Sequence, residues 1–521
     1  MESSNIKKQY DFIIIGSGFG GSVSALRLSQ KGYSVLVIEK GKWKKPEDFP
    51  KTNWNLKKWM WLPFLGFKGI FKMTFFRHLS VISGVGVGGG SLVYANTLPK
   101  PKDNFFNSGS WKDILNWKDE LEPFYDIAYK MLGATENPEY FDADLILKGL
   151  AEDFSLDDKF ERTKVAVFFG EEDKEVSDPY FEGEGPARSG CNFCGQCMTG
   201  CPYNAKNTLD KNYLYLAQKY GAEILPEHFV TGVTPTEQGY EISFRKTGKY
   251  FSKKKKLFAS GIVFAGGVLG TVPLLLKLKN SSLPKVSDRI GMDIRSNNEA
   301  LIFVTSTLGN IDMSKGVAIG SILNTSEHRH LEPVRYGSGS GFWRIGVLPL
   351  VSEPVWWKRI VKLVVKLVKE PLKWIRIYTV KNFAKQTVVL LYMEDLEGKL
   401  KMKPGRFFPL TSLQDGNPPS AFLPKAQKLA GRYAEKVKGK PLTFILETLT
   451  GTPSTAHILG GCVIGKDKES GVIDENHKIF GYDNLYVCDG SAVSANPGVN
   501  PALTITAMTE RAMSKIQKKQ R

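Results

Sequence analysis

Residues 10–39 read YDFIIIGSGFGGSVSALRLSQKGYSVLVIE, and this stretch decides the fold. Residues 10–15 are a β-rich apolar run, residues 22–32 a helical stretch, and residues 33–38 a second apolar run that leads into Glu39. The spacing predicts a βαβ unit of about thirty residues, with GxGxxG at its first turn and an acid at the end of its second strand.

The glycines of this unit predict a dinucleotide site. Gly16 permits the tight turn, Gly18 lets the backbone approach a pyrophosphate at the positive end of the helix, and Gly21 lets helix and strand pack closely. Glu39 is expected to hydrogen-bond a ribose hydroxyl, and its negative charge argues against a 2′-phosphate. The motif alone does not separate FAD from NAD.

Three further segments narrow the choice of cofactor. Residues 84–97 read GVGVGGGSLVYANT, residues 259–276 read ASGIVFAGGVLGTVPLLL, and the carboxyl end carries HILGGCVIG from His457 and GYDNLYVCDGSAVSANPGVNPALTITAMTERA from Gly481. In this order, and over nearly the whole chain, they resemble the glucose-methanol-choline (GMC) family of FAD oxidoreductases, and within it the bacterial cholesterol-oxidase-like branch.

The resemblance implies an α/β fold in which a Rossmann-like FAD-binding domain is interleaved with an α+β substrate domain on an antiparallel sheet. The FAD-binding domain is expected to take residues 1–48, 79–98, 222–300 and 455–521. The substrate-binding domain is expected to take residues 49–78, 99–221 and 301–454.

The same motifs carry the expected FAD contacts. A glycine-rich loop at 84–90 can lay its backbone against a flat ring or a diphosphate. Asparagine is a strong N-cap and proline suits the first helical position, so Asn500-Pro501 predicts a helix over 502–516 whose positive end faces the flavin. Besides the residues of the βαβ unit, the expected contacts are Gly88, Gly89, Ser91, Tyr94, Asn96, Val230, Gly266, Asp489, Gly490, Asn500 and Pro501.

The resemblance assigns the catalytic pair to His457 of the HxLGG motif and Asn500 of the GVNP motif. It implies that a lipophilic alcohol, either a sterol or a long-chain alcohol, is oxidised to a carbonyl compound by hydride transfer to the flavin. His457 would take or position the hydroxyl proton, and a neutral imidazole near its unperturbed pKa suits that work.

Cholesterol oxidases that isomerise the steroid double bond use a glutamate in the substrate domain, and the sequence does not place it. Residues 341–345, GFWRI, offer Arg344 instead, and Glu299 is a candidate only through its nearness in sequence to the flavin domain. Two other functions stay open. One is light-driven fatty-acid decarboxylation on the same fold, and the other is electron transfer by a bound flavin without alcohol turnover.

Two segments, 54–77 and 355–377, interleave large apolar side chains with lysine and arginine. The second predicts a helix that ends before Pro371, apolar over most of its surface, with a basic side formed by Lys358, Arg359, Lys362, Lys366 and Lys369. Together with a net charge of +18, this pattern predicts peripheral contact with an anionic membrane. No nucleic-acid module accompanies the basic residues, so nucleic acid is not an expected partner.

The amino-terminal apolar run is too short for a signal peptide, and no stretch of about eighteen uncharged apolar residues occurs. The expected location is therefore the cytoplasm, at the inner face of the membrane.

Four of the six cysteines lie in residues 191–202, CNFCGQCMTGCP. This is the spacing of the bacterial ferredoxin run, which makes Cys191, Cys194, Cys197 and Cys201 candidate ligands of an iron–sulfur cluster. Reduced thiols in a compact turn are the alternative. With a cluster, electrons would leave the flavin toward a carrier, whereas without one oxygen stays open as the acceptor.

Overall fold

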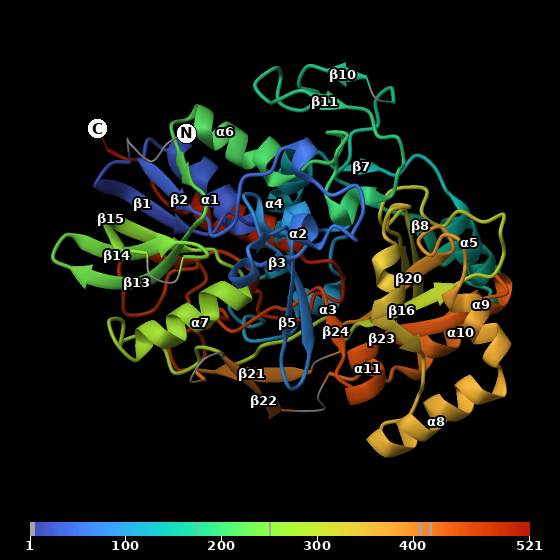
Figure 1. Cartoon of the computed structure of the whole chain (residues 1–521). Helices are drawn as coiled ribbons and strands as arrows, with labels where there is room; N and C mark the ends of the chain where they lie inside the picture. The colour runs from blue at the N-terminus through green and yellow to red at the C-terminus, as the bar shows by residue number, and fades with distance from the viewer. Residues whose placement is uncertain are drawn as a thin grey trace.

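The computed structural model describes residues 6–172, 174–249, 252–396, 398–405, 409–415 and 419–520, and two sheets organise it (Figure 1). The first sheet has the order β12-β2-β1-β15-β14-β13, and β25 pairs with β15. Its parallel strands are β1 (Gln9–Ile15), β2 (Val35–Ile38), β12 (Glu223–Leu225), β15 (Lys255–Phe264) and β25 (Leu485–Val487). The antiparallel hairpin at its edge consists of β13 (His228–Thr236) and β14 (Gly239–Lys246).

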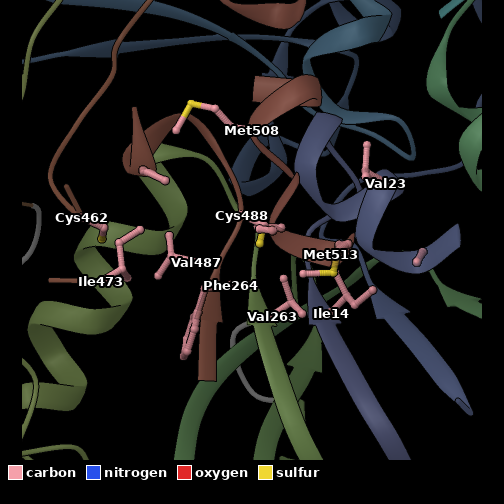
Figure 2. Packing of buried hydrophobic residues seen from close by; sticks show 14 of the residues in the cluster. Ile14, Val23, Val263, Phe264, Cys462, Ile473, Val487, Cys488, Met508 and Met513 are labelled. Carbon is pink, nitrogen blue, oxygen red and sulfur yellow. The ribbon is translucent and has the colours of Figure 1, made fainter. Parts of the chain in front are cut away.

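The core of the first sheet lies between its strands and the helices α1 (Phe19–Gln30) and α12 (Ala502–Ser514), which pack against each other. Parallel strands are covered on both faces, and this is why 12–15 and 262–264 read as continuous apolar runs. Figure 2 shows strand and helix side chains meeting there, among them Ile14, Val263, Val23 and Met513. Cys462 and Cys488, the two cysteines outside the 191–202 segment, are buried in this core.

The second sheet is antiparallel, with the order β19-β23-β16-β20-β18-β17-β8. Its strands are β8 (Phe160–Arg162), β16 (Ala300–Thr305), β17 (Ser321–Ser326), β18 (Arg329–Val334), β19 (Val347–Pro349), β20 (Thr387–Glu394) and β23 (Lys440–Phe444). One face packs against α5 (Asp142–Asp153) and α10 (Pro424–Lys436). The other face packs on side chains of the 84–97 loop, including Leu92 and Val93, so it lies over the glycine-rich segments.

The remaining elements are short or peripheral. The helices are α2 (Leu56–Trp59), α3 (Asp103–Phe106), α4 (Trp117–Leu132), α6 (Tyr213–Lys219), α7 (Val268–Lys279), α8 (Trp356–Lys369), α9 (Pro371–Tyr378) and α11 (Ile445–Thr450). The strands are β3 (Trp61–Leu62), β4 (Phe67–Lys68), β5 (Phe71–Phe75), β6 (Ser80–Gly84), β7 (Thr135–Glu136), β9 (Lys164–Val165), β10 (Glu175–Val176), β11 (Arg188–Ser189), β21 (Lys399–Lys403), β22 (Leu410–Asp415) and β24 (Ser454–Thr455).

The predicted fold class, an α/β flavin-binding unit interleaved with an antiparallel-sheet unit, is confirmed. The exact domain boundaries stay a prediction. Among the helices of the described residues, none has the length and apolarity needed to cross a bilayer.

The two basic segments differ from each other in the structure. Residues 355–377 form α8 and then α9, because Pro371 stops the first helix and occupies the first turn of the second. Residues 54–77 fold instead into the short helix α2 and the strands β3 to β5, with Trp59 and Phe71 stacked in the core.

Candidate active site

The GxGxxG turn has the shape that a diphosphate needs. A Cβ at Gly16 would lie 2.4 Å from the Ala265 carbonyl oxygen, and a Cβ at Gly21 would lie 2.1 Å from the Gly16 carbonyl oxygen. At Gly18, by contrast, a Cβ would meet no atom within 4 Å. Two glycines are therefore required by close packing, and the third leaves open space at the amino end of α1.

The second glycine-rich loop lies directly against the first. A Cβ at Gly89 would stand 2.7 Å from the Cα of Gly18, and both Gly88 and Gly89 have positive φ. Ser91 stabilises the loop from within, because its hydroxyl donates to the Gly88 carbonyl at 2.7 Å. These residues form the cradle into which the dinucleotide would fit.

Several predicted cofactor residues make hydrogen bonds within the protein. The Glu39 carboxylate, at the end of β2, accepts from the Ser17 hydroxyl at 2.8 Å and from Gly41 N at 2.8 Å. A carboxylate has about four lone-pair positions, so room for a ribose hydroxyl is left. The Tyr94 hydroxyl donates to the Asn207 carbonyl at 2.9 Å, and burial raises the pKa of this phenol.

Asp489 joins two helix starts near the cradle. Its buried carboxyl accepts from Gly267 N at 2.9 Å, from the Thr271 hydroxyl and from the Ser491 hydroxyl. Burial outweighs these hydrogen bonds and raises the pKa of Asp489. Asp489 therefore holds the start of α7, next to Gly266, against the turn at Gly490.

The other predicted cofactor residues are distributed around this cradle. Val230 lies in β13, at a bulge of the edge hairpin, and Asn96 is buried with a φ of 68° at the end of the second glycine-rich loop. The cofactor contacts of these two residues stay predictions.

His457 is placed by the turn that pairs with Gly490, because Gly460 N donates to the Gly490 carbonyl at 3.0 Å. Its Nδ1 lies 2.7 Å from Glu299 Oε1. Burial favours the neutral imidazole, but the Glu299 carboxylate outweighs burial and raises the pKa of His457. The expectation of an unperturbed imidazole is therefore wrong, since a charged partner adjoins it.

Asn500 lies just before α12 but does not cap it. The helix takes Pro501 as its N-cap residue without a side-chain cap, and Asn500 Oδ1 is buried with no hydrogen-bond partner among the described residues. The predicted capping role is wrong, and so is the predicted first helical position of Pro501. An unpartnered buried amide oxygen is instead available to a ligand, which fits the predicted catalytic role.

Sequence reasoning missed Glu332, in β18. In a strand, alternate side chains share a face, so Glu332 lies on the same face as Val334, toward the glycine-rich loop. Its two carboxylate oxygens are buried and accept no hydrogen bond from the residues that the structure describes, and His330 Nε2 lies 3.6 Å from the nearer one. Its charge contributes to the raised pKa of His457, so the two groups lie near each other.

Residues 341–345, where the glutamate of isomerising cholesterol oxidases was sought in the sequence, have a different role. Residues 341–346 form a 3₁₀ turn, and Arg344 donates to the Val380 carbonyl at 2.5 Å, on the side of α9. In HRHLEPV, Glu332 alternates with Leu331 and Pro333 as a solvent-facing polar residue would, so its burial could not be recognised before the sheet was known.

The predicted iron–sulfur cluster is not supported. Cys191, Cys194, Cys197 and Cys201 do line one pocket. Across the described part of the chain, however, no three His, Cys, Asp or Glu side chains are grouped so that they could hold a metal ion. Lys206 lines the same pocket and donates to the Cys197, Tyr94 and Leu92 carbonyls, and burial lowers its pKa to about 7.

Comparison with known proteins decides the family. The GMC oxidoreductase models match residues 186–296 and 416–509, and a Rossmann-like NAD(P)-binding model matches residues 14–42. A cholesterol oxidase of Acinetobacter baumannii is 43% identical over 526 residues, covering 98% of this chain and 95% of that protein. The chain belongs to the GMC oxidoreductase family.

Further relatives and a solved structure are similar to this chain over nearly its whole length. A cholesterol oxidase of Mycobacterium tuberculosis is 40% identical over 98% of this chain and 91% of its own length. A long-chain-alcohol oxidase of Arabidopsis thaliana is 25% identical over 97% of this chain and 67% of its own length. The crystal structure of pyridoxine 4-oxidase from Mesorbium loti has a TM-score of 0.61 at 14% identity, covering 97% of this chain and 98% of that one, and supports the fold.

Membership of the cholesterol-oxidase-like branch of the GMC family makes this protein an FAD-dependent oxidoreductase of CH–OH donors. The open face of Gly18 and the adjoining loop at Gly89 fit the diphosphate of FAD. The sequence-based choice of FAD as cofactor is thereby confirmed.

Proposed function

We propose that this protein oxidises the hydroxyl group of a lipophilic alcohol, a sterol or a long-chain alcohol, to a carbonyl. The observation that carries the proposal is the position of His457 and Glu332 near the face of the second sheet that packs on the 84–97 loop. That face is an apolar cluster whose members include Phe303, Ile319, Val334, Leu391 and Met393. The names of the relatives, cholesterol oxidase and long-chain-alcohol oxidase, support the same substrate class.

His457, Asn500 and the FAD-binding residues have different roles in this oxidation. A carboxylate only accepts, so the Nδ1 of His457 carries the proton shared with Glu299, and its Nε2 is free to take the substrate's hydroxyl proton. Asn500, whose Oδ1 has no hydrogen-bond partner among the described residues, orients the hydroxyl group. FAD, which the residues around Gly18 and Gly89 would hold, would supply the two-electron acceptor for the hydride.

A second activity, isomerisation of a steroid double bond, is favoured by Glu332. That reaction carries a proton from one carbon of the substrate to another, and the base must stand in an apolar site beside the ring system. Glu332 meets this requirement, since it is buried in the apolar face with no hydrogen-bond donor committed to it among the described residues.

We also propose that α8 and α9 rest on an anionic membrane. Their outward face is apolar, and Val368 and Leu372 are 72% and 79% exposed. The other exposed members of this face are Trp356, Trp357, Val361, Val364, Val365 and Ile375. Exposed lysines flank it, among them Lys358, Lys362 and Lys369, which complement anionic headgroups.

The substrate proposal is tested by anaerobic bleaching of the flavin absorbance with sterols, fatty alcohols and small polyols. Bleaching by sterols or fatty alcohols is expected, and bleaching by small polyols alone would contradict the lipophilic site.

Admission of air to the bleached enzyme then tests oxygen as the electron acceptor. Fast return of the flavin absorbance indicates an oxidase, and slow return indicates a carrier-dependent dehydrogenase. Hydrocarbon formed from fatty acid under blue light would favour decarboxylation, whereas a flavin that no donor bleaches would favour electron transfer.

A further inference from the structure

Glu299 lies behind His457, immediately before β16, and its side chain is completely buried. Its Oε1 lies 2.7 Å from His457 Nδ1 and accepts from the Thr455 hydroxyl at 2.8 Å, while its Oε2 accepts from Ala456 N at 3.0 Å. Burial alone would favour protonation, but the charge of His457 and these hydrogen bonds hold the pKa of Glu299 below its usual value. The carboxylate therefore stays charged against the imidazole.

The segment that carries Glu299 also holds the loop of the second catalytic candidate. Arg295 and Leu459 exchange both backbone hydrogen bonds at 2.9 Å, which fixes the segment beside the strand-like stretch after His457. Two residues before Glu299, Asn297 donates its side-chain amide to the Val499 carbonyl at 2.8 Å. Residues 295–299 thus join the turn of His457 to the turn of Asn500.

We propose that Glu299 is a positioning residue of the oxidation, an inference that rests on the proposed function. It fixes the tautomer and orientation of His457 so that Nε2 is unprotonated and directed to the substrate. When the O–H bond breaks, the proton goes to Nε2. Bound FAD would supply the acceptor for the hydride, which carries both electrons of the C–H bond of the carbinol carbon. The imidazolium that results is stabilised by the Glu299 carboxylate.

Two further carboxyl groups face this pair from other elements. Glu332 approaches His457 from β18, and Glu447 approaches Glu299 from α11. Glu447 is buried, accepts from Ser454 N at 2.7 Å and from the Thr443 hydroxyl, and burial raises its pKa to about 7. Because Glu447 is as buried as Glu299 but makes no hydrogen bond to His457, it provides the matched control.

A narrow pocket adjoins Glu299. Glu299 lines it together with Ser454, Thr455 and the half-buried Ser420. Truncation of Glu299 to alanine would remove its carboxyl group and enlarge this pocket. A small carboxylate such as formate, added in solution, then serves as a replacement for the missing group.

The experiment compares the holoenzyme variants Glu299→Gln, Glu299→Ala and Glu447→Gln with the wild type. For Glu299→Gln we expect kcat to fall on the order of 100-fold, with KM within about twofold. The unprotonated imidazole is the active form, so wild-type activity is lost as pH falls through the raised pKa of His457. Without the carboxylate that pKa falls, and the acid limb of the kcat profile moves to lower pH.

Formate should restore activity to Glu299→Ala in proportion to its concentration and should leave His457→Ala inactive. Glu447→Gln should keep the acid limb in place. The positioning role would be overturned if the acid limb of Glu299→Gln did not move. It would also be overturned if the Glu299 and Glu447 variants lost equal activity together with bound flavin. If the wild type oxidises none of the alcohols, the proposed function fails separately, and NMR titration of the His457 ring still decides whether Glu299→Gln lowers its pKa.

Discussion

At Gly18 the backbone leaves space where any other residue would place a side chain, and that space is where a cofactor phosphate would stand. The neighbouring glycines could not accept a Cβ without moving the backbone. A substitution at Gly18 can therefore change cofactor binding without disturbing the fold.

We expect Gly18→Ala to lower FAD affinity by at least about tenfold while the folded protein remains, because the methyl group excludes the close phosphate approach. Fluorescence titration of the apoprotein with FAD measures the change. Gly431→Ala in α10 is the matched control, because a Cβ there also meets no atom within 4 Å but lies far from the glycine-rich loops in sequence. Equal FAD affinity in the two variants would contradict the placement of the diphosphate.

Glu332→Gln should separate isomerisation from oxidation. The amide cannot carry a proton between carbons, so a Δ5-3β-hydroxysterol should be oxidised and its unconjugated ketone should accumulate. Ultraviolet absorbance of the conjugated enone, followed beside flavin bleaching, measures the two steps. Retention of enone formation in the variant would remove Glu332 from the reaction.

How far the site could be predicted depends on the range of the contacts that build it. Gly16, Gly18 and Gly21 serve a local turn, and their spacing was sufficient. Glu299 meets His457 across 158 positions of sequence, and Glu332 reaches the site only through the pairing of β18 with β20, so neither role was readable before the sheet was known. The prediction that Asn500 caps α12 rested on the general preference of asparagine for N-cap positions. In the folded protein Asn500 does not cap the helix.

At the scale of elements, α8 is attached to the rest of the protein largely through polar side chains. Arg359, predicted to lie on the basic lipid-facing side, is buried, and its guanidinium donates to the carbonyls of Glu353, Pro354 and Leu449 and lies over the Phe422 ring. Lys366 donates to the Leu350 carbonyl. Polar side chains thus hold the helix to the body, and much of its apolar surface faces outward.

Replacing Trp357, Val361, Val364 and Val368 by serine should reduce binding to anionic vesicles at least tenfold, because each side chain would otherwise leave water on contact with lipid. Flavin bleaching by a short, water-soluble alcohol should not change. Co-sedimentation with phosphatidylserine-containing vesicles measures the loss. Leu145→Ser, at an exposed position of α5, is the control, and equal binding of the four-residue variant and the control would contradict membrane docking.

At the scale of the whole molecule, His477 couples folding to pH. It is buried between the turn at Asp474 and β25, its Nδ1 donates to the Val487 carbonyl, and burial with the nearby Arg511 lowers its pKa to about 3. The unfolded chain binds a proton at its ordinary pKa near 6.5 and the folded protein does not, so this residue makes stability fall as pH drops below 6.5.

We expect the contribution of His477 to approach about 1.4 kcal/mol per pH unit between pH 6 and pH 4. Asparagine tolerates the positive φ of this position and does not titrate, so His477→Asn should flatten the dependence of unfolding free energy on pH in that window. Urea unfolding at several pH values measures it. A slope equal to that of the wild type would contradict the buried neutral imidazole.

The overall architecture was predictable because each family motif marks a segment of the first sheet or a turn beside it. The structure of the cysteine segment was not predictable, since the same spacing serves a metal cluster or a turn. Only the placement of the thiols in the folded protein separates the two. The 54–77 segment has the composition of an amphipathic helix, but its aromatic residues pack into the core through two hairpin-like turns.

The outward apolar face of α8 also determines how the protein behaves when lipid is absent. Water leaves this surface as readily against a second copy of the protein as against a bilayer, since the gain depends on area and not on the partner. In lipid-free buffer the particle size should therefore grow with protein concentration, and a mild detergent that coats the helix should return it to the size of a single chain.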